Sequence, residues 1–136
     1  MADVSPWERH LIDRFVLRSK RERYLELLKG PKHRQKILER LNHAFDYDPA
    51  YATLLDAACK TEQGLRDLLR RRHVADTCWL MADGNAHDGH ELRLEHGITE
   101  LLRNHWGAVL LCPPKPIAVY KTEDPADVFL LERPAP

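Results

Sequence analysis

The sequence predicts an α+β fold in which a helical N-terminal half packs on a small mixed β-sheet of four strands. Before residue 73, apolar residues recur at helical spacing. After it, short apolar runs alternate with breaks rich in Pro, Gly and Asp. The 136 residues are 43% hydrophobic and 31% charged, as in ordinary globular proteins. We therefore expect a single domain, 1–136, with a helical part (1–73) and a sheet part (74–133).

The first helix is expected to begin at Ser5 and Pro6. Ser5 can cap the helix, Pro6 suits its first position, and Glu8 completes a capping box. Residues 19–28 repeat the capping-box pattern, which predicts either a bend in one long helix or the start of a second. The Gly-Pro pair at 30–31 then ends the helical pattern.

Three more helices are expected before residue 73, giving about five in this half. One runs from about Lys32 to Phe45 and presents its basic residues to solvent. Another covers 51–58 after the Asp-Pro signal at 48–49, with Leu54 on its apolar face. The last follows Thr61, a candidate N-cap.

In the sheet half, residues 77–82 form the first predicted strand. The polar loop 83–90 follows, and an apolar stripe over 94–102 predicts a crossover helix that ends near Gly107. A strand, a helix and a strand in succession predict a right-handed crossover between parallel neighbours.

Three further strands are expected at 108–112, 117–120 and 128–131, separated by proline-containing loops. Short connections between them predict an antiparallel meander at the C-terminus. The runs are almost continuously apolar, which predicts a sheet covered on both faces.

Composition narrows the class of protein. No apolar stretch approaches the roughly 20 residues needed to span a bilayer. The N-terminus lacks the apolar core of a signal peptide. The three cysteines are odd in number and have no metal-ligand spacing, which indicates a reducing compartment without a disulfide framework. These observations predict a cytoplasmic protein that has no membrane association and needs no cofactor.

Charge is unevenly placed, although the formal net charge is zero. Residues 1–43 carry net +5 and the remainder net −5. Clustered cations attract phosphate backbones, but the glutamates between them are typical of a solvated helix face or a protein-binding surface. The candidate residues for contact with a partner or nucleic acid are Arg18, Lys20, Arg21, Arg23, Lys32, Arg34, Lys36 and Arg40.

The loop 83–91 gathers two aspartates, two histidines, an asparagine and a glutamate. His87, Asp88 and His90 are the candidate catalytic residues, as general acids or bases. We expect no metal, because the two loop histidines lack the helical i, i+4 pairing of zinc-binding motifs. Alternatively, Asp, Asn and Gly here merely supply the geometry of an exposed turn.

These features favour a small, non-catalytic cytoplasmic binding or regulatory protein that acts through another macromolecule, most plausibly a protein. Nucleic-acid binding through the basic helices is one alternative, and a small hydrolase or RNase that uses the loop histidines is another. The sequence contains no nucleophile-elbow, phosphate-loop or dinucleotide-binding motif. The enzyme hypothesis requires His87, Asp88, His90 and the region of His73 to converge on one cleft.

Overall fold

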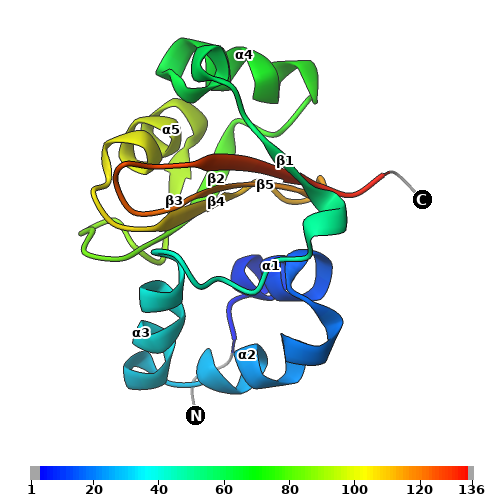
Figure 1. The fold of residues 1–136 in the computed structure, drawn as a ribbon, viewed down its shortest axis with the longest axis vertical. Helices are drawn as coiled ribbons and strands as arrows, with labels where there is room; N and C mark the ends of the chain where they lie inside the picture. The colour runs from blue at the N-terminus through cyan, green and yellow to red at the C-terminus, as the bar shows by residue number, and fades with distance from the viewer. Residues whose placement is uncertain (1–3, 135–136) are drawn as a thin grey trace.

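The chain folds into three layers, with a β-sheet between two groups of helices (Figure 1). The computed structural model describes residues 4–134. Helices α1 (Pro6–Phe15), α2 (Arg21–Leu27) and α3 (Pro31–Arg40) cover one face of the sheet. Helices α4 (Glu62–Arg71) and α5 (Leu94–Arg103) cover the other. The predicted α+β class is confirmed, and none of the described helices is long and apolar enough to cross a membrane.

The sheet has six strands in the order β1-β6-β5-β4-β2-β3, and every pair of neighbours is antiparallel. The predicted C-terminal meander is confirmed, since β5 pairs with both β4 and β6. The strand bounds are β1 Ala52–Leu54, β2 Thr77–Ala82, β3 His90–Arg93, β4 Ala108–Leu111, β5 Ile117–Lys121 and β6 Val128–Glu132.

Two of these strands were not expected, so the prediction of a mixed four-strand sheet was wrong. Residues 51–58, predicted as a helix, contain edge strand β1 between two short 3-10 turns, Pro49–Tyr51 and Ala57–Lys60. The presumed apolar face of that helix includes Leu54, which is 60% exposed. The segment instead gains backbone hydrogen bonds by pairing with β6. The helix expected to reach Phe45 also ends earlier, at Arg40.

The second unexpected strand, β3, changes the topology. It forms a hairpin with β2 and reverses the chain before α5 begins. Consequently β2 and β4, which had been expected to be parallel, are antiparallel. The crossover helix exists, but it joins β3 to β4, two strands that run in the same direction on either side of β2.

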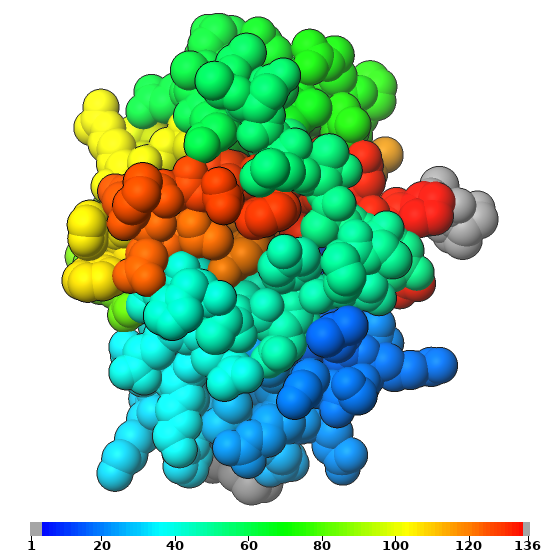
Figure 2. Space-filling model, viewed as in Figure 1, coloured from blue at the N-terminus to red at the C-terminus, as the bar shows by residue number. Residues whose placement is uncertain are grey.

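Alternation along the strands divides the core into two. In β4, Val109 and Leu111 face α1–α3, whereas Ala108 and Leu110 face α4 and α5. All four side chains are fully buried. The expectation of a sheet covered on both faces is therefore confirmed, and Figure 2 shows helical segments above and below the strands.

Two glycines mark places where backbone elements lie unusually close. A Cβ on Gly97 of α5 would collide with the Sγ of Cys78, so α5 sits tightly against β2. A Cβ on Gly107 would collide with the backbone of Leu41, just after α3. Gly107 is therefore needed for close approach between segments. Helix α5 ends before Gly107, where its end was expected, because its C-cap is Asn104.

Leu101 of α5 is fully buried between the helix and the sheet. We expect Leu101→Ala to lower the free energy of unfolding by about 2–5 kcal/mol, because it removes apolar contacts and leaves a cavity. Urea denaturation measures the loss. The matched control, Leu54→Ala on the exposed edge strand, should change stability by less than about 0.5 kcal/mol. Equal effects of the two variants would contradict the assignment of the core.

His10 of α1 is buried, at 6% exposure, and its Nε2 has no hydrogen-bond partner among the described residues. Burial and nearby Arg14 lower its pKa from 6.5 to about 4, against the opposing effects of the Lys115 backbone and Asp13. Between these two pH values the unfolded chain binds more protons at this position than the folded one. His10 therefore contributes to stability at neutral pH, and that contribution is lost as the pH falls.

We expect stability to decline on acidification from pH 6.5 to about 4 with a His10 component of at most about 1.4 kcal/mol per pH unit. Denaturation midpoints at a series of pH values would show it. His10→Gln should flatten the slope whatever its effect at neutral pH, and His90→Gln, at an exposed histidine, should leave it intact. An unchanged slope in His10→Gln would show that other groups control acid stability.

Candidate functional site

A groove of about 560 Å³ between α2 and α3 collects half of the predicted basic residues. Lys20 immediately precedes α2, and Arg23 lies in its first turn. Lys36 and Arg40 lie four positions apart on α3 and therefore share one face of it. In Figure 2 the light-blue to cyan segments that carry these helices make up the lower end of the molecule. The remaining lining residues are Ser19, Tyr24, Leu27, Glu39, Ala44 and Asp46.

The floor of the groove is a closed hydrogen-bond network. The Tyr24 hydroxyl donates to Asp46 Oδ2 at 2.7 Å, and Arg40 Nη2 donates to the same oxygen at 2.9 Å. Burial raises the pKa of Tyr24. Burial opposes ionisation of Asp46, but hydrogen bonds from Tyr24 and Arg40 outweigh it and lower the pKa of this carboxyl. The charge of Arg40 is thus matched within the protein.

The other three cations of the groove are differently placed. Lys20, Arg23 and Lys36 are exposed. No side chain within 4.0 Å forms an ion pair with any of them in residues 4–134. Because their ammonium and guanidinium groups surround one concave surface, the groove is suited to bind an anionic group.

The remaining four basic candidates lie outside this groove. Arg18 and Lys32 are exposed, and in the sequence they lie within four residues of the lining residues Ser19 and Lys36. Arg21 is half-buried and donates from Nε to the Val16 carbonyl at 3.0 Å, so it supports the turn after α1. Arg34 was expected on the outer face of its helix, but this was wrong. Its side chain points inward and is only 18% exposed.

Arg34 bridges two carboxylates from distant parts of the chain. It donates to Glu8 Oε1 at 3.0 Å and Oε2 at 2.7 Å, and to Asp88 Oδ1 at 2.9 Å. Glu8 is 4% exposed and also accepts a hydrogen bond from Trp79 Nε1 at 2.9 Å. Burial opposes the charge on Arg34, but the two carboxylates outweigh it and raise its pKa. The sequence predicted that Glu8 completes a capping box, but its carboxylate binds Arg34 and Trp79 instead.

The three candidate catalytic residues of the loop lie in different surroundings. Asp88 pairs with Arg34 and accepts a hydrogen bond from the Ala82 amide. His90 is exposed at the start of β3, with Nδ1 2.9 Å from the Asp88 carbonyl. His87 turns to the opposite face, toward α5. His73 has a positive φ of 57° just after α4. Because Asp88 faces Arg34 and His87 faces α5, the described residues do not show the single cleft that the enzyme hypothesis requires.

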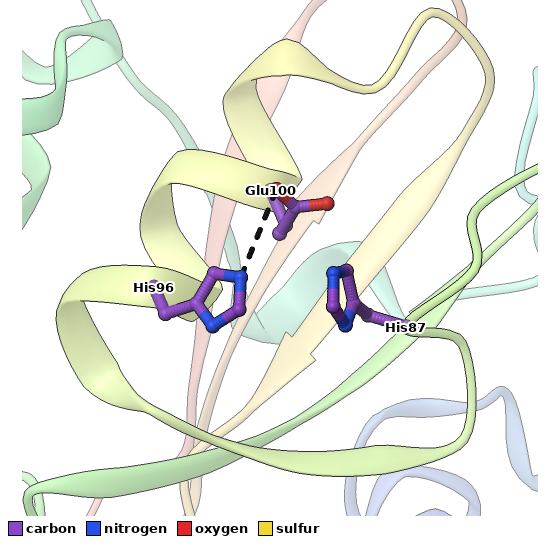
Figure 3. Close-up of side chains that lie close together, drawn as sticks. All are labelled: His87, His96 and Glu100. Carbon is purple, nitrogen blue, oxygen red and sulfur yellow. Dashed lines mark ion pairs between the residues drawn. The ribbon is translucent and has the colours of Figure 1, made fainter.

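His87 instead meets two residues of α5 that the sequence did not single out as its partners. Figure 3 shows the imidazoles of His87 and His96 side by side, with the Glu100 carboxylate above the gap between them. The ring centroids of His87 and His96 are 4.8 Å apart, and His96 Nε2 lies 3.9 Å from Glu100 Oε2. The i, i+4 spacing of His96 and Glu100 is a readable signal, but their approach to His87 depends on the tertiary fold.

The comparisons with known proteins add no functional information. No protein-family model matches the chain, and no curated protein or solved structure shows significant similarity to it. Any function must therefore be argued from the groove and the side-chain clusters themselves.

Removal of the Arg34 bridge should be costly. We expect Arg34→Met to lower the free energy of unfolding by about 3–5 kcal/mol, since Glu8 would remain buried without its cationic partner. Arg34→Lys should recover only part of the loss, because an ammonium cannot bind two carboxylates through a planar fork. Urea denaturation measures the free energy of unfolding of both variants and of the control Arg23→Met, which changes an exposed residue of α2. A loss for Arg34→Met no larger than for Arg23→Met would refute a structural role of the bridge.

Proposed function

We propose that this protein is a non-catalytic binding protein whose groove between α2 and α3 takes an acidic segment of a protein partner. The observation that carries the proposal is the convergence of Lys20, Arg23 and Lys36 on one concave surface. Within residues 4–134 none of the three forms an ion pair within 4.0 Å of a carboxylate. Three thiols that form no disulfide, Cys59, Cys78 and Cys112, agree with the proposed cytoplasmic location.

The groove favours a short acidic peptide over a continuous phosphate backbone. Glu39 lies in its lining, and Glu22 and Glu26 are exposed on the neighbouring helix. These carboxylates would repel an evenly charged strand, whereas a peptide can place its own carboxylates only beside the cations. The floor made by Tyr24 and Arg40 is held by internal hydrogen bonds, so this part of the groove is organised before binding.

Nucleic acid remains the second candidate, because Arg18 and Lys32 add exposed positive charge on the same basic segment of the chain. It makes a different quantitative prediction. Three phosphate contacts would give a slope of about −3 in the logarithm of affinity against the logarithm of salt on duplex DNA. A hydrolase has less support, since the loop histidines and Asp88 do not share a site in the described structure.

The test is fluorescence anisotropy with a labelled peptide rich in Asp and Glu, in parallel with a labelled RNA and a labelled DNA duplex. We expect the triple variant Lys20→Gln, Arg23→Gln, Lys36→Gln to weaken peptide binding at least about tenfold, or about 1.4 kcal/mol. The matched control is Arg70→Gln, Arg71→Gln, Lys115→Gln, which removes equal charge from exposed positions outside the groove. It should bind as the wild type does.

Equal losses in the two triple variants would mean that net charge alone attracts the peptide, which would contradict a specific groove. RNA or DNA binding tighter than peptide binding at physiological salt, with the steep slope above and loss only in the groove variant, would replace the protein partner by nucleic acid.

A further inference from the structure

We propose that His87, His96 and Glu100 form a binding site for a single zinc-class divalent metal ion. Each residue offers one ligand atom, and these atoms all lie within 4.8 Å of one another. His87 comes from the loop after β2, and the other two come from successive turns of α5 (Figure 3). The site lies on the face of the sheet opposite the basic groove, so it is independent of the function proposed above.

The donor set matches the chemistry of zinc. Imidazole nitrogens and a carboxylate oxygen are its usual ligands in proteins, and helical residues four positions apart can bind the same ion. Ligand atoms of a tetrahedral ion at about 2.0–2.1 Å lie roughly 3.4 Å from one another, so the ligand atoms, now within 4.8 Å of one another, need to approach by up to about 1.4 Å. The His96 side chain is 46% exposed and the Glu100 side chain 25%, which leaves both room to rotate.

Asn85 holds the two sides of the site together. Its Oδ1 accepts a hydrogen bond from the His87 amide at 2.8 Å, and its Nδ2 donates to Glu100 Oε1 at 3.1 Å. The same Nδ2 also donates to Asn104, which is 7% exposed and itself donates to the Asp83 carbonyl at 3.0 Å and the Trp106 carbonyl at 2.9 Å. The hydrogen bond from Asn85 therefore fixes the orientation of Glu100 Oε1. Such hydrogen bonds to a ligating carboxylate are a common support of metal sites.

Three protein ligands would leave a fourth coordination position for water or another small ligand, beside exposed His96. The earlier expectation of no metal considered only ligands within the loop, His87 with His90. The fold separates those two and supplies two ligands from α5 instead.

The experiment is isothermal titration of untagged protein, stripped with a chelator, with zinc ion alone as the probe. We expect saturable binding of one equivalent. His96→Ala should weaken it by about a hundredfold or more. Asn85→Ala should weaken it by about tenfold, within the range typical for groups that orient a metal ligand. The matched control His90→Ala removes an exposed histidine from the same segment of chain and should bind zinc as the wild type does.

Circular dichroism of each metal-free variant confirms that the fold is retained, and a Glu100→Gln variant provides a second ligand test if His87 or His96 variants lose structure. Absence of saturable zinc binding in the wild type would overturn the proposal. Equal loss of affinity in His90→Ala and His96→Ala would also overturn it, because binding would then be distributed over surface histidines.

Discussion

The arrangement of the N-terminal helices depends on the ionic bridge from Arg34 to Glu8 and Asp88. The Arg34 guanidinium comes from α3 and binds Glu8 of α1 and Asp88 of the β2–β3 loop at the same time. Trp79 of β2 donates to the same Glu8, and its ring stacks on Trp7 with centroids 5.6 Å apart. Two helices, a strand and a loop therefore meet at one buried ionic cluster. A planar group with several donors suits this role, because each carboxylate can be bound without loss of the other.

The β2–β3 loop is consequently held from both faces of the sheet. On one face Asp88 binds Arg34, and Asp83 accepts hydrogen bonds from Gln35 and Asn42. On the other face Asn85 binds Glu100 and Asn104 of the α5 region. A segment rich in turn-forming residues thereby becomes a fixed support that presents His87 to α5. The same contacts hold α3 in place, and α3 forms one wall of the basic groove.

Local patterns in the sequence predicted much of this architecture. Ser5 and Pro6 begin α1 as expected, since capping depends on neighbouring residues. The apolar runs around Val109, Val119 and Leu130 form adjacent strands with both faces buried. Residues 52–54 and 90–93 were missed as strands because they are short and largely exposed, and only pairing with β6 and β2 makes them strands.

The sequence by itself determined the α+β class, the C-terminal meander and the concentration of positive charge near α2 and α3. These properties depend on the periodicity and composition of contiguous residues. Only the tertiary structure decided that Lys20, Arg23 and Lys36 surround a groove while Arg34 turns inward. It also decided that His87 meets His96 and Glu100 rather than His90. The physical reason is that Arg34 and His87 find their partners far away in the sequence, so these contacts depend on how the packed elements bring distant residues together.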